Sequence, residues 1–145
     1  MTMTAREAFE KGTATFNAHD IDGFANTLAD DVAFRAPGGM RGSGRAACAA
    51  FFGSWFDAFP DAHVEVQAVH FAGDVAVEEG TFTGTQNGIL RSPMGDIAPT
   101  GRRVEVDYIH VLRFRDGKHV AFNLVFDRLA MLEQLGLVPA PAAAR

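Results

Sequence analysis

The chain has 145 residues, of which 48% are hydrophobic and 21% charged, and a formal net charge of −5. One soluble globular domain fits this length and composition, and the acidic balance argues against a nucleic-acid binder, since phosphate neutralisation needs a surplus of Lys and Arg. A single cysteine excludes an internal disulfide, and the absence of an apolar run of about 18 residues argues against a membrane-spanning helix.

The first part of the chain carries helical patterns on either side of a short strand. Apolar residues form one stripe over residues 4–18, which predicts a helix, and Asp20 is predicted to cap a second, short helix. Residues 32–36 are typical of a strand, which ends at a Pro-Gly-Gly breaker. Ser43 is predicted to cap a third helix, which Pro60 ends because proline cannot continue it.

Beyond this third helix the apolar period changes to two, which predicts strands. The expected strands cover residues 64–68, 75–85, 104–114 and 118–126, and Asp127 is expected to cap a last helix over residues 128–135. Residues 86–103 form a loop that is long enough to be a rim or a lid. We expect one domain over residues 1–138 and a disordered Ala/Pro tail over residues 139–145.

Helices followed by antiparallel strands indicate an α+β fold. We expect a cone, in which a curved antiparallel sheet packs on the N-terminal helices and an apolar pocket lies between the two layers. The thirteen phenylalanines either fill the core or line a hollow for a flat apolar ligand. The predicted pocket wall includes Phe16, Phe34, Trp55, Phe122 and Leu124.

The final predicted hairpin places two polar side chains on an apolar face. Apolar residues occupy the even positions of both strands, and matching them requires an odd loop length, which we take as the three residues 115–117. His110 is then opposite Phe122, and Tyr108 is opposite Leu124. Away from a carboxylate, a buried His110 would be neutral and could bond to a ligand carbonyl or hydroxyl. The alternative is a core histidine bonded to the backbone or to water.

Two adjacent carboxylates on a middle strand are further candidates. One of Glu78 and Glu79 must point inward if the strand is regular, and a buried carboxylate would be a serviceable base. We favour the alternative of a solvated face or a salt bridge to Arg102 or Arg103.

The remaining histidines and the cysteine suggest no chemistry. His19 and His119 lie at the ends of elements, where we expect them at the surface. Cys48 falls inside a helix and not beside a base. We expect no metal and no cofactor, because neither paired histidines nor clustered carboxylates show a metal-ligand spacing.

Seven short strings carry a resemblance to a known family by their order and spacing. They lie at residues 37–39 (PGG), 58–61 (AFPD), 84–88 (GTQNG), 99–102 (PTGR), 110–118 (HVLRFRDGK), 126–127 (FD) and 134–137 (QLGL). Together they resemble the SnoaL-like polyketide cyclases, or ester cyclases, of the nuclear-transport-factor-2-like superfamily. The resemblance implies the same α+β cone, a deep apolar pocket and a homodimer formed through the outer sheet. Charge, composition and the charged residues at positions 1–11 predict a cytoplasmic protein that binds neither nucleic acid nor membrane.

The resemblance also implies metal-free acid–base catalysis of an intramolecular aldol closure. Such cyclases use an aspartate six residues after the lysine of the Asp-Gly-Lys turn, beside a histidine eight residues before that lysine. His110 stands at the histidine position, but Leu124 stands at the aspartate position. Leucine cannot carry a proton, so the mechanism does not transfer intact.

Three functions follow as hypotheses. The first is a cofactor-free cyclase for an apolar oxygenated ligand such as a polyketide, with His110 as the acid–base group, Tyr108 assisting, and Glu78 or Glu79 replacing the missing aspartate. The second is an isomerase, dehydratase or epoxide hydrolase on the same scaffold. The third is a non-catalytic ligand-binding or dimerisation module that kept the pocket.

Overall fold

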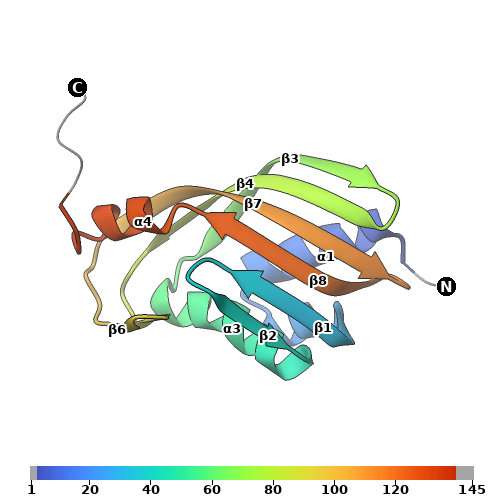
Figure 1. Cartoon of the computed structure of the whole chain (residues 1–145), viewed down its shortest axis with the longest axis horizontal. Helices are drawn as coiled ribbons and strands as arrows, with labels where there is room; N and C mark the ends of the chain where they lie inside the picture. The colour runs from blue at the N-terminus through green and yellow to red at the C-terminus, as the bar shows by residue number, and fades with distance from the viewer. Residues whose placement is uncertain (1–2, 140–145) are drawn as a thin grey trace.

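The structure is a computed structural model that describes residues 3–139, and Figure 1 shows its course from the N-terminal helices to the C-terminal one. The helices are α1 (Ala5–Asn17), α2 (Ile21–Ala25), α3 (Arg45–Ala58) and α4 (Arg128–Gln134). The strands are β1 (Leu28–Ala36), β2 (Met40–Ser43), β3 (His63–Ala72), β4 (Val75–Thr85), β5 (Leu90–Ser92), β6 (Gly95–Ile97), β7 (Arg103–Arg115) and β8 (Lys118–Phe126). Apart from residue 139, the predicted tail lies outside the described residues. Within residues 3–139 no helix has the length and apolar character needed to cross a membrane.

A curved sheet of six strands, in the order β2-β1-β8-β7-β4-β3, covers the N-terminal helices (Figure 1). The predicted α+β cone is therefore confirmed. One pairing differs from the expected antiparallel sheet, because β1 runs parallel to β8. The hairpin of β1 and β2 joins the sheet beside the last strand, which brings the start of the chain next to its end. The pattern analysis missed β2 because its Met-Arg-Gly-Ser sequence has no apolar alternation.

Capping residues begin two of the helices where the sequence predicts. Asp20 and Asp127 each accept a hydrogen bond from the backbone N–H three residues later, at 2.9 and 3.0 Å. The predicted cap Ser43 is wrong. Ser43 pairs with Ala33 in the sheet, and the N-cap of α3 is Gly44, whose φ of 94° suits glycine.

Aromatic side chains from both layers fill the space between the sheet and the helices. The ring of Phe52 on α3 contacts those of Phe16, Phe24 and Phe122 at centroid distances of 6.4, 4.9 and 5.0 Å. Tilted and edge-on pairs of this kind contribute about 0.5–1.5 kcal/mol each beyond their burial. One ring thus ties α1, α2 and α3 to β8.

The long segment after β4 is built around one buried side chain. The amide of Gln86 donates to the carbonyl oxygens of Gly88, Ile97 and Ala98, and its oxygen accepts from the backbone and hydroxyl of Thr100. Gln86 is fully buried, so these bonds are shielded from water. The segment also contains the β5–β6 hairpin. A polar anchor therefore holds this segment in place.

The β7–β8 turn corrects the predicted three-residue loop. Arg115 pairs with Lys118, so the turn has two residues, Asp116 and Gly117. Their φ angles of 52° and 72° are both positive, as a type I′ turn requires. Asp-Gly is among the sequences that favour this turn, because both residues tolerate left-handed backbone.

The predicted partners across this hairpin are shifted by two residues. His110 pairs with Leu124 and not with Phe122, and Tyr108 pairs with Phe126 and not with Leu124. A shift of two preserves the face of every side chain, since strands have a period of two. His110 and Tyr108 therefore point to the inner face as predicted, although their neighbours differ.

Candidate active site

An apolar cavity lies between the inner face of the sheet and helices α1 to α3. Its empty space, including that open to solvent at the mouth, is about 760 Å³. Four of the five predicted wall residues line it: Phe16, Trp55, Phe122 and Leu124. Phe34 does not, because α3 covers β1 at that point and the Phe34 ring stacks on that of Phe51 at a centroid distance of 4.7 Å.

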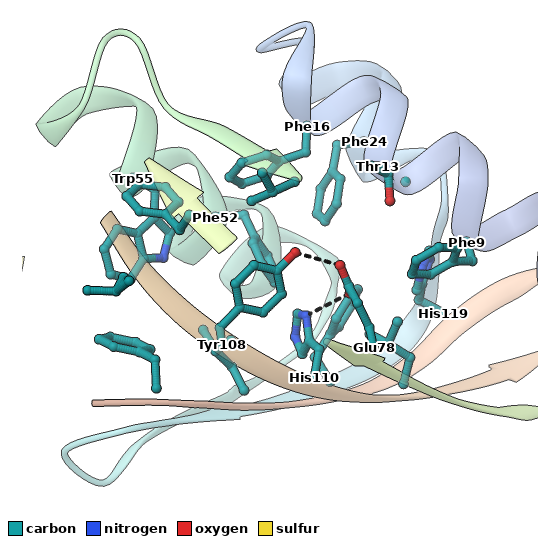
Figure 2. Close-up of a pocket in the computed structure, with 18 of the residues that line it drawn as sticks. Phe9, Thr13, Phe16, Phe24, Phe52, Trp55, Glu78, Tyr108, His110 and His119 are labelled. Atoms are coloured by element: carbon teal, nitrogen blue, oxygen red, sulfur yellow. Dashed lines mark hydrogen bonds and ion pairs between the residues drawn. The ribbon is translucent and has the colours of Figure 1, made fainter. Parts of the chain in front are cut away.

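One carboxylate lies in the otherwise apolar wall of this cavity. Glu78 of β4 is only 5% exposed and lines the cavity, whereas Glu79 is exposed on the outer face. The Tyr108 hydroxyl donates to Glu78 Oε2 at 2.5 Å, and His110 Nδ1 lies 3.7 Å from Oε1 (Figure 2). The expected solvated face or salt bridge is therefore wrong for Glu78, because the regular alternation of β4 turns this residue inward.

A glycine makes the Tyr108–Glu78 contact sterically feasible. Tyr108 pairs directly with Gly80 across β7 and β4, and its ring leans along β4 toward Glu78. A Cβ atom at Gly80 would lie 2.5 Å from Tyr108 Cζ, too close for any real contact. Gly80 therefore leaves the space that the phenol ring occupies.

The surroundings of Tyr108 hold its hydroxyl in the protonated form. Burial raises the pKa of Tyr108 far above its ordinary value, and the neighbouring charge of Glu78 raises it further. The phenol is thus a permanent donor to the carboxylate. A hydrogen bond from a buried donor to an ionised acceptor is about twice as strong as a neutral one.

His110 lies between a carboxylate and a leucine. Its direct cross-strand neighbours are Glu78 on β4 and Leu124 on β8. The condition attached to a neutral His110, burial away from a carboxylate, is therefore not met, and of the two candidate carboxylates Glu78 is the one beside it. Among the described residues, no group hydrogen-bonds to its buried Nε2 atom. Unpaired buried polar atoms are rare in folded proteins and usually have a functional or solvent explanation.

His119 is a cavity residue that the sequence reasoning placed at the surface. Val120 is an extra residue in β8, so that Phe114 pairs with His119 and the imidazole turns inward. His119 is 2% exposed and lines the cavity. The sequence contained an indication of this bulge. Asp-Gly favours a two-residue turn, and such a turn aligns the apolar faces of the two strands only if one strand carries an extra residue.

Hydrogen bonding fixes the tautomer of His119. Its Nδ1 lies 3.1 Å from the carbonyl oxygen of Thr27, which can only accept, so Nδ1 carries the hydrogen and Nε2 a lone pair. Burial lowers the pKa of His119 to about 4; the Thr27 carbonyl and Glu78 act against that shift, and His110 adds to it. His119 is therefore a neutral acceptor near pH 7.

We predict that wild-type protein loses up to about 3 kcal/mol of unfolding free energy relative to His119→Asn as the pH falls from 6.5 to about 4. In this window the imidazole is protonated in the unfolded chain and neutral in the folded one, so acid favours unfolding. Asparagine keeps a donor for Thr27 and does not titrate. Urea unfolding at a series of pH values measures the difference.

A histidine on the surface provides the control for this measurement. His70→Asn on exposed β3 is expected to retain the wild-type pH profile. Parallel profiles for wild type and His119→Asn would contradict the buried neutral imidazole.

The other titratable candidates carry no reactive arrangement. Burial raises the pKa of the Cys48 thiol to about 12, which leaves it unreactive. His19 is half-buried, not fully exposed as expected, and its Nε2 lies 2.7 Å from the Ala62 carbonyl oxygen. Within the described part of the chain, no three His, Cys, Asp or Glu side chains are placed to share a metal ion.

Comparison with known proteins identifies related sequences and folds. A family model described as "SnoaL-like domain" matches residues 9–122. No curated protein matches the chain. Among solved structures, AclR from Streptomyces galilaeus, assigned as a hydroxylase, is 27% identical with a TM-score of 0.79, over 96% of this chain and 85% of AclR.

Two further solved structures are similar in fold. A protein from Jannaschia sp. CCS1, assigned as a SnoaL-like polyketide cyclase, is 22% identical with a TM-score of 0.82 and covers 93% of each chain. A protein from Catenulispora acidiphila DSM 44928 with a ketosteroid isomerase-like fold, in complex with trimethylamine, is 18% identical with a TM-score of 0.77, over 94% of this chain and 96% of that one. At these identities the likeness concerns the fold alone.

Proposed function

This chain belongs to the SnoaL-like domain family, and from that premise we propose that it is a cofactor-free acid–base enzyme for an apolar carbonyl compound such as a polyketide. The reaction would be of the cyclase or isomerase type, with a proton removed from carbon beside a carbonyl. The observation that carries this proposal is the buried Glu78, bonded to Tyr108 and adjacent to His110, in an apolar cavity.

The position of Glu78 supports its role as the replacement for the aspartate of the related cyclases. That aspartate position, Leu124, flanks His110 from β8, whereas Glu78 flanks the same histidine from β4. The carboxylate thus stands on the opposite neighbouring strand and remains beside the imidazole. A carboxylate, unlike leucine, can take a proton from a substrate carbon.

The three side chains suffice for a balanced proton cycle. Glu78 takes the proton from the carbon beside the carbonyl, and Tyr108 holds the carboxylate in place. The new carbanion forms a bond to a second carbonyl carbon, or takes the proton back from the Glu78 carboxyl group at another carbon. The oxygen that gains charge in a closure receives a proton from His110 Nε2. His110 Nδ1, beside Glu78, then receives the proton that the carboxylate took. Exchange of the imidazole hydrogens with water restores the starting tautomer.

The walls favour a flat apolar ligand over a charged one. They are largely aromatic, and among the described residues no lysine or arginine lines the cavity. In an apolar pocket, the few polar groups fix the orientation of the ligand, and burial of its apolar surface provides the affinity. An aromatic or polycyclic ketone fits this description.

A cytoplasmic location stays a prediction. We also propose that the chain forms a homodimer through the outer face of the sheet. Large apolar side chains are exposed there on three neighbouring strands: Val77 of β4 at 38%, Ile109 of β7 at 47% and Val125 of β8 at 55%. Ile109 pairs directly with Val125, so part of this surface is continuous. Association of two such faces would remove these apolar side chains from water.

Hydrogen–deuterium exchange tests the proposed proton abstraction without the natural substrate. We expect the protein to accelerate exchange of the protons beside the carbonyl of beta-tetralone in D₂O, in proportion to protein concentration, as followed by proton NMR. Heat-denatured protein provides the background rate. Saturable binding of the ketone with no acceleration would contradict an enzyme and favour the non-catalytic binder.

A further inference from the structure

Two polar side chains at the α1 side of the cavity have no part in the proposed proton cycle. They are Thr13 of α1 and His119 of β8, and both line the cavity. Figure 2 shows the Thr13 hydroxyl directed from α1 into the cavity, on the side where His119 lies. Polar groups inside an apolar wall are candidates for fixing the orientation of a ligand.

The Thr13 hydroxyl differs from that of its neighbour on the same helix. Thr15 returns its hydroxyl to the backbone carbonyl oxygens of Lys11 and Gly12, at 2.8 and 3.1 Å, as helical threonines commonly do. Within residues 3–139 the Thr13 hydroxyl makes no such bond. It is therefore free to donate to a group in the cavity.

His119 presents a complementary atom. Because Nδ1 donates to the Thr27 carbonyl, Nε2 is an acceptor, and no described residue hydrogen-bonds to it. The residue is only 2% exposed. An acceptor on an apolar cavity wall gains a hydrogen bond when a ligand or water supplies the hydrogen.

Gly12 brings this acceptor edge close to Thr13. A Cβ atom at Gly12 would lie 3.0 Å from Cε1 and 3.3 Å from Nε2 of His119. The imidazole edge therefore approaches α1 at the residue next to Thr13. One donor and one acceptor thus face the cavity from adjoining positions.

We propose that Thr13, Gly12 and His119 form a second polar subsite, which binds a neutral hydroxyl group of the ligand. The ligand hydroxyl donates to His119 Nε2 and accepts from the Thr13 hydroxyl. This inference rests on the proposed function and extends it: the substrate is a carbonyl compound with a hydroxyl at its other end. A carboxylate is excluded, because its lone pairs would face that of Nε2 without any cation nearby.

Matched ketones with and without a hydroxyl test the subsite. Each pair consists of one ketone and its derivative with a hydroxyl on the aromatic ring, at the position farthest from the carbonyl. The three ketones are acetophenone, benzylacetone and beta-tetralone. For wild type we expect the hydroxyl derivative to bind about tenfold more tightly in at least one pair, by isothermal titration. Thr13→Val and His119→Asn should reduce this preference, taken as the ratio of the two affinities within one variant, to about threefold or less.

A control variant and a spectroscopic signal separate this role from a structural one. Thr15→Val, which changes a hydroxyl already bonded to the backbone, is expected to keep the full preference. The ¹⁵N resonance of His119 Nε2 should shift when the hydroxyl derivative binds and stay in place with the plain ketone.

The possible failures are distinguishable. Equal affinities within every pair, or an undiminished preference in both variants, would overturn the subsite and leave the proposed function intact. Absence of binding by all six compounds would contradict the carbonyl-binding cavity and both proposals with it.

Discussion

Glu78→Gln is expected to reduce the acceleration of ketone exchange by roughly 100- to 10,000-fold, the usual effect of removing a general base. Glutamine has nearly the same size as glutamate, and its side-chain oxygen can still accept the Tyr108 hydrogen bond. It cannot take a proton from carbon. The exchange rate of beta-tetralone at saturating ketone measures the loss directly.

The adjacent residue supplies a matched control. Glu79→Gln removes the same charge from the same strand, but on the outer face, where Glu79 is exposed and pairs with Ile109. This variant should exchange at the wild-type rate. Equal losses in the two variants would indicate a general effect of charge or stability. A loss in His110→Ala without one in Glu78→Gln would transfer the role of base to the imidazole.

Gly80→Ala is expected to reduce the exchange rate about 10- to 100-fold, because that factor corresponds to the loss of one hydrogen bond to a charged group. The new methyl group would occupy the space of the Tyr108 ring and displace its hydroxyl from Glu78. If Gly80 acts only through this bond, Tyr108→Phe should lose a similar factor. The double variant should then lose little more than either single variant, since both remove one interaction.

Overpacking by itself requires a separate control. Gly84 lies on the same face of β4, and a Cβ atom there would stand 2.9 Å from Cβ of Phe59, away from Tyr108. Gly84→Ala should cost about 1–3 kcal/mol of stability, as Gly80→Ala should. It should retain the exchange rate at temperatures well below unfolding. A comparable loss of exchange in Gly84→Ala would assign the effect of Gly80→Ala to general strain.

Local patterns in the sequence predicted the elements well where one physical rule governed them. Strands β4 and β8 begin and end at the predicted residues, since period-two alternation and turn residues bound them. The caps Asp20 and Asp127 follow from the short reach of a carboxylate to nearby backbone N–H groups. Strand β2 was not predicted, because it depends on pairing with β1 and carries no pattern of its own.

The candidate site was predicted in part. The position of His110 and Tyr108 on the inner face of the sheet follows from the alternation of the strand. A register error of two residues does not change that face. His119 was missed because the extra residue Val120 reverses the alternation at the start of β8. Such a bulge is a property of two strands together, so inspection of either strand alone does not reveal it.

The α+β cone, the family and the inward face of the strand that carries His110 follow from the amino-acid sequence alone, since each depends on periodicity or on motif order within the chain. Three other features became visible in the folded chain: Glu78 contacts Tyr108 and His110, Phe34 packs on Phe51, and His119 lines the cavity. These outcomes depend on which strands become neighbours and in which register. Residues about thirty positions apart in the chain meet only when long-range pairing is complete, and no local pattern encodes that distance.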